Sequence, residues 1–143
     1  MYLGEMMKET DMLNAWLWKK HRHDLQWRRV RLGVLPTKEW ARMYMTILRW
    51  TDAIVVKDGV IRIVESKLRA DPGALGQLEL YKKLFYNTPE FSAYKEWDVE
   101  LVLLTAVLDV NMVELCSEKN ITYALFTEEQ VNKVRIEMML PTV

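Results

Sequence analysis

The stretch from Thr51 to Lys67 constrains the fold more than any other, because it predicts two β-strands joined by a tight turn. Asp58-Gly59 separates two runs rich in β-branched residues, and this dipeptide tolerates the positive φ angles that close a two-residue hairpin. The turn sets the register, so Asp52 is expected opposite Glu65. Because side chains alternate along a strand, both acids and Lys67 then share one largely apolar face.

Two carboxylates directly opposite each other would have Cβ atoms about 4.5 to 5.5 Å apart, and like charges so placed destabilise a sheet. Either one acid holds a proton, or a cation lies between them. Lys67 supplies one positive charge but leaves several oxygen lone pairs free. A hard divalent ion such as Mg²⁺ takes carboxylate and carbonyl oxygens and water, so a magnesium site is one hypothesis. The other is an ion pair of Lys67 in an inert sheet, which is disfavoured because a buried pair with an extra acid is costly.

This region resembles the core motif of the PD-(D/E)XK nuclease superfamily, which includes type II restriction enzymes, archaeal Holliday junction resolvases and many phage nucleases. The residues that carry the resemblance come in a fixed order along the chain: Asp52, Glu65, Lys67, Gln77 and Tyr81. The usual Pro-Asp of the family is here Thr51-Asp52, which leaves the acid in place. The resemblance spans roughly residues 5 to 127.

The resemblance implies an endonuclease that depends on Mg²⁺ or Mn²⁺ and hydrolyses phosphodiester bonds in DNA by attack of a metal-activated water. It also implies four metal ligands: Asp52, Glu65, the Ser66 carbonyl and Glu9 of the first helix. Glu5 lies four residues before Glu9 and remains an alternative, and both could be solvated acids of a first helical turn. Asp52 and Glu65 would act together with Lys67 and Gln77, where Lys67 positions the water or stabilises charge and Gln77 orients Lys67 or the phosphate. The alternative function is a catalytically silent module that binds DNA or serves in an assembly, against which the intact acids count.

Basic residues gather between Lys19 and Arg49, although the formal net charge of the whole chain is zero. Any DNA contact must therefore come from local clustering. The predicted first strand carries Arg28, Arg29 and Arg31 around Trp27, a mixture that suits contact with a phosphate backbone. We expect these arginines and Tyr81 to contact DNA. The alternative is that the arginines protect a solvated strand edge.

The whole chain, residues 1 to 143, is expected to form one domain. Hydrophobic periodicity and turn signals predict helices over residues 4–20, 72–86, 110–119 and 128–139, and strands over 25–33, 46–57, 60–68, 99–107 and 121–126. This order predicts an α/β fold: a three-layer α/β/α sandwich with a mixed central sheet, which is also the restriction-endonuclease-like arrangement.

Cys116 is the one cysteine of the sequence, which excludes an intramolecular disulfide and suits a reducing interior. No apolar run approaches the roughly 20 residues needed to cross a bilayer, so no membrane association is expected. These observations predict an intracellular, cytoplasmic protein. A homodimer is implied by the resemblance alone; the six tryptophans could cover a subunit interface or simply pack in the core.

Overall fold

The computed structural model describes residues 7–34 and 49–140. Within these ranges the elements follow one another in this order: α1 (Glu9–His21), β1 (Leu25–Leu32), β2 (Arg49–Lys57), β3 (Val60–Lys67), α3 (Pro72–Phe85), the 3-10 helix η2 (Pro89–Tyr94), β4 (Asp98–Thr105), α4 (Val110–Glu118), β5 (Ile121–Leu125) and α5 (Glu128–Met139). The order expected from the sequence is confirmed. The segment between α3 and β4, for which no helix was predicted, contains η2.

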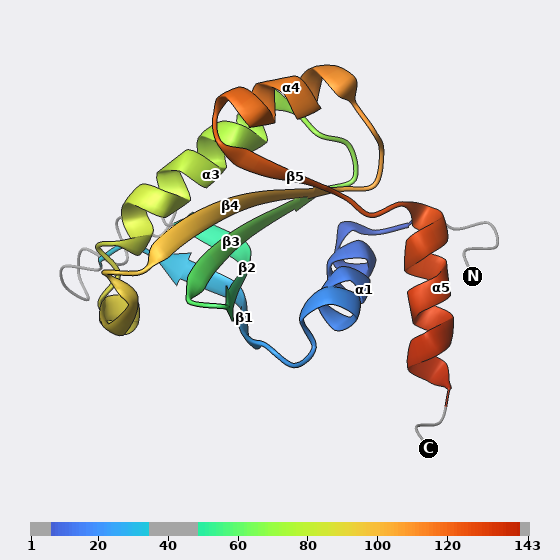
Figure 1. Cartoon of the computed structure of the whole chain (residues 1–143), viewed down its shortest axis with the longest axis horizontal. Helices are drawn as coiled ribbons and strands as arrows, with labels where there is room; N and C mark the ends of the chain where they lie inside the picture. Colours follow the sequence, from blue (N-terminus) through green and yellow to red (C-terminus); the bar gives the residue numbers. More distant parts are fainter. Residues whose placement is uncertain (1–6, 35–48, 141–143) are drawn as a thin grey trace.

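The described strands form one sheet in the order β1-β2-β3-β4-β5. The first three strands are antiparallel, whereas β3, β4 and β5 run parallel. Parallel neighbours need crossover connections, and α3 and α4 provide them on one face of the sheet. The other face is covered by α1 and α5 (Figure 1). The chain is therefore a three-layer α/β/α sandwich with a mixed sheet, as predicted.

Each face of the sheet packs against its own hydrophobic core. Ile54 and Ile63 belong to the core under α3 and α4, whereas Val55 and Val64 belong to the core under α1 and α5. Both faces of β4 are likewise buried, since Leu103 joins the first core and its neighbours Val102 and Leu104 join the second. A sheet covered on both sides explains why these strands are nearly continuous apolar runs.

The hairpin forms in the predicted register, with Lys57 opposite Val60 and successive pairs following as far as Ala53 and Val64. Asp58 and Gly59 have φ angles of 52° and 75°, which a two-residue turn of this kind requires. Side chains also cap two of the helices: the carboxylates of Asp71 and Asp109 accept hydrogen bonds from the backbone at the starts of α3 and α4.

The sheet is distorted at Asp52. The ladder between β1 and β2 is interrupted where Arg29 would face Asp52, and it resumes in the same register on the other side. Arg29 has a φ of 49°, which is uncommon for a residue other than glycine. The ladder between β2 and β3 also ends at Ala53 and Val64, so the expected ladder pairing of Asp52 with Glu65 is not formed. Because Asp52 is in neither ladder, its carboxylate is free to bond with the end of β3.

No helix in the described part of the chain is long and apolar enough to cross a membrane. Cys116 lies buried on α4, and burial raises the pKa of its thiol. The expected start of the second strand at residue 46 and the alternative ligand Glu5 lie outside the described residues.

Candidate active site

Asp52 and Glu65 come together at the end of β3, although they do not form a ladder pair. The Asp52 Oδ2 accepts two hydrogen bonds from Ser66, one from its backbone N and one from its Oγ, both at 2.8 Å. Glu65 is 5% exposed, and its Oε2 accepts a hydrogen bond from the Tyr81 hydroxyl at 3.1 Å. The sheet distortion thus brings the two acids from adjacent strands together in a largely buried pair.

The surroundings of Glu65 favour its protonated form. Burial raises its pKa from 4.5 to about 8, and the hydrogen bond to Asp52 and the charge of Asp52 act in the same direction. The Tyr81 hydroxyl and the charge of Lys67 act in the opposite direction. Of the two ways to relieve the repulsion between these carboxylates, the chain without metal therefore uses protonation.

Lys67 lies two residues beyond Glu65 on β3, half-buried, and its ammonium is close enough to favour the ionised form of Glu65. The structure thus brings together Asp52, Glu65 and Lys67. Gln77 is exposed on α3 and forms no hydrogen bond with these residues in the described structure. Its role beside Lys67 stays a prediction.

Tyr81 lies one turn after Gln77 on α3 and occupies the place beside the carboxylates. It is 4% exposed, and its hydroxyl is bonded to Glu65. The ring belongs to the core under α3, and in the structure Tyr81 is a partner of Glu65. A contact of Tyr81 with DNA stays a prediction.

Glu9 is the first residue of α1 and lies near the end of β3, where its Oε1 accepts a hydrogen bond from the Leu68 backbone N at 3.4 Å. Among the described residues, no group of three or more His, Cys, Asp or Glu is placed to hold a metal ion. The acidic centre is thus the pair Asp52 and Glu65. The roles of Glu9 and of the Ser66 carbonyl as metal ligands stay predictions.

The three arginines of β1 are held by three different contacts. Arg28 donates a hydrogen bond to the Asn14 side chain of α1. Burial lowers the pKa of the Arg28 guanidinium, and the negative charge of nearby Asp52 opposes this change. Arg29 places its guanidinium carbon 5.7 Å from the centre of the Trp50 ring. Arg31 pairs with Glu90 of η2 at 3.6 Å. DNA contact through these residues stays a prediction.

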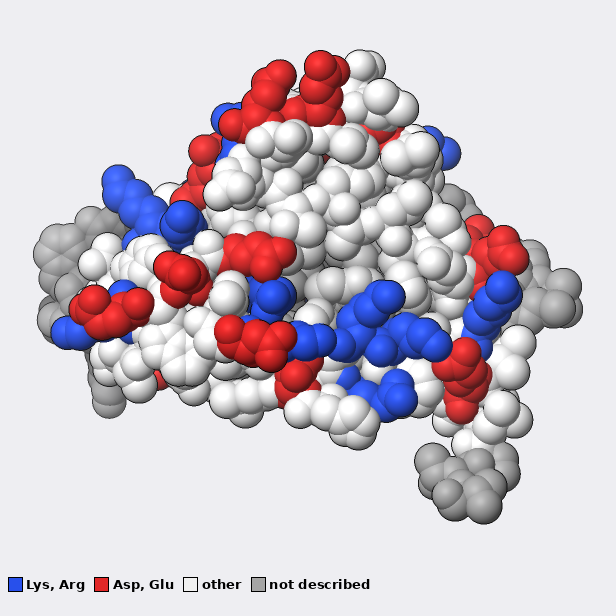
Figure 2. Space-filling model, in the orientation of Figure 1, with Lys and Arg blue, Asp and Glu red and all other residues white. Residues whose placement is uncertain are grey.

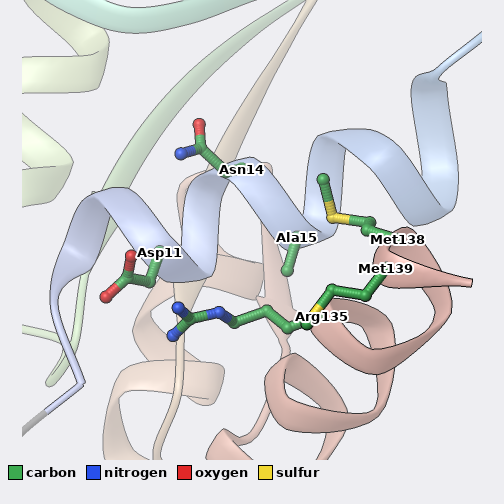
Figure 3. A pocket seen from close by; sticks show the side chains of 6 residues that line it. All are labelled: Asp11, Asn14, Ala15, Arg135, Met138 and Met139. Carbon is green, nitrogen blue, oxygen red and sulfur yellow. The ribbon is translucent and has the colours of Figure 1, made fainter. Parts of the chain in front are cut away.

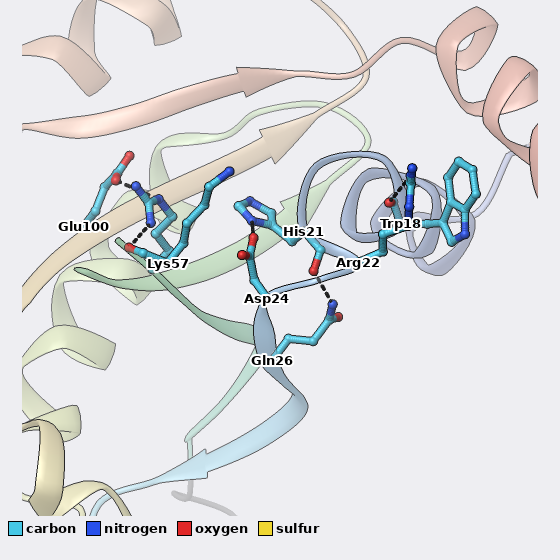
Figure 4. Close-up of polar contacts among 8 residues, drawn as sticks. Trp18, His21, Arg22, Asp24, Gln26, Lys57 and Glu100 are labelled. Atoms are coloured by element: carbon cyan, nitrogen blue, oxygen red, sulfur yellow. Dashed lines mark hydrogen bonds and ion pairs between the residues drawn. The ribbon is translucent and has the colours of Figure 1, made fainter. Parts of the chain in front are cut away.

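The charges on the surface do not form a uniformly basic coat. On the face seen in Figure 2, Lys and Arg side chains gather near the middle, with Asp and Glu beside them. At the turn end of the hairpin, Arg62 pairs with Glu100 at 3.0 Å and donates to the Lys57 carbonyl, also at 3.0 Å (Figure 4). Nearby, the Nδ1 of His21 bonds to Asp24 at 2.9 Å. The guanidinium of Arg62 and the carboxylate of Glu100 thus neutralise each other.

A shallow cavity of about 300 Å³ lies between α1 and α5, on the other side of the sheet from Tyr81. Arg135 of α5 points toward Asp11 of α1, and Met138 and Met139 lie at the opposite end (Figure 3). Met139 is 85% exposed, as is common for apolar side chains that a second subunit covers. The homodimer stays a prediction.

No family model matches the chain, and no curated protein matches it. Two solved structures are similar to it. A repair endonuclease from Pyrococcus abyssi aligns with a TM-score of 0.54 and 18% identity over 86% of this chain and 49% of that chain. A protein of unknown function aligns with a TM-score of 0.54 and 10% identity, over 94% of the present chain and 71% of the chain of that second protein. This chain thus spans about half the length of the endonuclease, and at these identities the similarity shows the fold. The chain has a restriction-endonuclease-like fold, as the sequence motif implied.

Proposed function

We propose that the chain is a metal-dependent nuclease that hydrolyses phosphodiester bonds in DNA, with Asp52 and Glu65 holding Mg²⁺ or Mn²⁺. The observation that carries this proposal is the pair of carboxylates at the end of β3, in which the pKa of Glu65 is raised to about 8. An inert sheet would gain stability from apolar residues at these positions. The similarity in fold to a repair endonuclease supports the same conclusion.

The donor set fits Mg²⁺. This ion usually binds through one or two carboxylates, keeps several waters and takes substrate phosphate oxygens, so a site with two acids suffices. A divalent charge would replace the proton held between Asp52 and Glu65, since ligands must be deprotonated to bind. The Ser66 carbonyl is the third oxygen that we assign to the ion, and Glu9, close to the same strand end, is a further candidate.

When bound, Mg²⁺ would polarise the phosphate and lower the pKa of a coordinated water. The chain supplies the rest. Lys67 places a positive charge beside the acids, where negative charge develops on the phosphate. Ser66 fixes the Asp52 carboxylate through two hydrogen bonds, and Tyr81 holds Glu65 through one, so both act as positioning residues. Arg28, near Asp52, can contact a neighbouring phosphate oxygen.

The test is an incubation of the purified protein with plasmid, linear duplex, single-stranded and branched DNA, in Mg²⁺, in Mn²⁺ and with a chelator. We expect cleavage of at least one substrate with metal and none with the chelator. Asp52→Asn should abolish cleavage. Asp58→Asn is the matched control, because Asp58 is exposed in the turn of the same hairpin and asparagine also tolerates its positive φ.

Equal cleavage by Asp52→Asn and the unchanged protein would reveal a contaminating nuclease. A folded protein that binds DNA but cuts none of these substrates would contradict the enzymatic proposal. It would favour the silent DNA-binding or assembly module instead.

A further inference from the structure

An aromatic cavity of about 460 Å³ lies between the edge of the sheet and η2 and is not used by the proposed metal chemistry. The residues that line it come from β1, β2 and η2: Trp27, Val30, Arg31, Trp50, Glu90 and Phe91. Trp50 precedes Asp52 by two residues on β2, a Cα separation of about 7 Å along a strand. The cavity also lies on the same side of the sheet as Tyr81, because Trp27 and Phe91 belong to the same core as this tyrosine.

The aromatic lining is fixed by packing on one side and open on the other. Trp27 packs edge-on against Phe91, with ring centres 5.1 Å apart, and against Tyr94 at 6.2 Å. Both partners belong to η2, so this short helix forms a rigid wall of the cavity. Trp50, in contrast, is 42% exposed. A cavity of this volume with a preformed aromatic wall is typical of a binding site for a flat ligand.

The charges around the cavity suit a ligand that carries phosphate. Arg29 lies over the Trp50 ring, 5.7 Å from its centre. Glu90 is the acid of the lining, and its charge is matched by Arg31 at 3.6 Å. Arg29 therefore adds a positive charge at the rim. Aromatic rings with adjacent arginines are the combination by which proteins hold single nucleic-acid strands: rings stack on bases, and arginines follow the backbone.

We propose that this cavity, the Trp27–Trp50 pocket, binds an unpaired nucleobase of a nucleic-acid strand that continues to the Asp52–Glu65 pair. The inference rests on the proposed nuclease function and specifies its substrate class. In an intact duplex both faces of each base are stacked on neighbours, and a paired base must first be flipped out of the stack. A base therefore enters an aromatic pocket at the lowest cost from a single strand, a branch point or a frayed end. The preferred substrate therefore contains unpaired nucleotides next to the bond that is cut.

The test is the binding of labelled oligonucleotides, followed by fluorescence anisotropy with a chelator so that nothing is cleaved. We compare a single strand, a duplex of the same length and a single strand with abasic positions. The unchanged protein should bind the single strand more tightly than the other two. Trp50→Ala should weaken single-strand binding about 5- to 150-fold, the effect expected for loss of one base–aromatic stack. The weaker binding of the abasic strand should be insensitive to this substitution.

Trp18→Ala is the matched control, because Trp18 also has an arginine over its ring, Arg22 at 4.3 Å, but packs against the core on the other face of the sheet. It should leave binding unchanged. Trp50→Phe keeps a ring and should retain most of the affinity, which separates stacking from a folding defect if Trp50→Ala is unstable. Equal affinity for single strand and duplex, or no effect of Trp50→Ala in a folded protein, would overturn the pocket.

The two proposals can fail separately. Cleavage that requires Asp52 together with binding that ignores Trp50 would keep the nuclease and reject the pocket. Single-strand binding that depends on Trp50 without any cleavage would keep the pocket and reject the nuclease.

Discussion

Replacing Glu65 by glutamine should stabilise the metal-free protein above neutral pH and leave its stability nearly unchanged near pH 4. The pKa of Glu65 is about 8 in the folded chain against a usual 4.5, because the carboxyl is buried beside Asp52. Below pH 4.5 the folded and unfolded chains both hold this proton. As the pH rises from there through 8, the unfolded chain loses the proton first, so the favourable contribution to folding is lost across this window.

The magnitude follows from the same two pKa values. Each tenfold change in proton affinity corresponds to about 1.4 kcal/mol, so the rise from 4.5 to about 8 corresponds to at most about 5 kcal/mol of unfolding free energy. Relaxation and water entry reduce this, and we expect Glu65→Gln to exceed the unchanged protein by about 2 to 5 kcal/mol at pH 9. The amide should keep the network, since its oxygen can accept from Tyr81 and its nitrogen can donate to Asp52.

The assay is urea unfolding with a chelator at pH 4, 7 and 9, and the quantity compared is the difference in unfolding free energy between the variant and the unchanged protein. Glu96→Gln is the control, because Glu96 is exposed and its replacement removes one negative charge without touching the site. Its difference should stay small at all three pH values. If the difference for Glu65→Gln were also independent of pH, Glu65 would not hold a proton that the unfolded chain releases, and the reasoning would be refuted.

Two further perturbations test the metal and the arginines. At a hundredfold excess over its dissociation constant, Mg²⁺ should stabilise the protein by about 2.7 kcal/mol, a melting shift of several degrees in scanning fluorimetry. Asp52→Asn should melt above the metal-free unchanged protein, and its melting temperature should change little when Mg²⁺ is added. An equal shift in both proteins would place the ion elsewhere. Arg29→Gln should weaken DNA binding equally for all DNA sequences and lower the slope of log affinity against log salt concentration by about one. Anisotropy titrations measure this slope. An unchanged slope would mean that Arg29 protects the edge of the sheet instead.

The elements that local chemistry determines could be predicted from the sequence. The Asp58-Gly59 turn sets the hairpin register, and Asp71 and Asp109 mark the starts of two helices, because each acts on backbone within a few residues of itself. The fold followed from the order of these elements. The register and the alternation of side chains also predicted that Asp52 and Glu65 lie near each other, although the ladder pairing expected between them is not formed.

What could not be predicted depends on contacts between distant residues. Nothing near Arg29 in the sequence indicates its positive φ, and the hydrogen bond of Ser66 to the Asp52 carboxylate joins residues 14 positions apart. That Tyr81, and not Gln77, contacts Glu65 could have been predicted, however. Tyr81 continues the apolar stripe of Leu75 and Leu78 at helical spacing, which places it toward the sheet and leaves Gln77 outside the stripe.

Tyr81 offers the sharpest test of the candidate site, because a DNA contact and a contact with Glu65 predict different results for Tyr81→Phe. The hydroxyl donates to the Glu65 Oε2 and lowers the pKa of that carboxyl, so its removal should raise this pKa further. A proton held more tightly competes better with a metal ion. More Mg²⁺ should then be needed for the same melting shift at pH 7, and the deficit should shrink at higher pH, where Glu65 ionises in both proteins.

DNA binding measured in chelator supplies the second readout for Tyr81→Phe, and it should match that of the unchanged protein because the ring is buried in the core. The substitution removes one oxygen and keeps the ring, so a loss of packing cannot account for a change that depends on pH. Weaker DNA binding with an unaltered Mg²⁺ requirement would instead assign the hydroxyl to the substrate. That outcome would mean that the ring leaves the core when DNA binds, since only then could the hydroxyl exchange Glu65 for a phosphate.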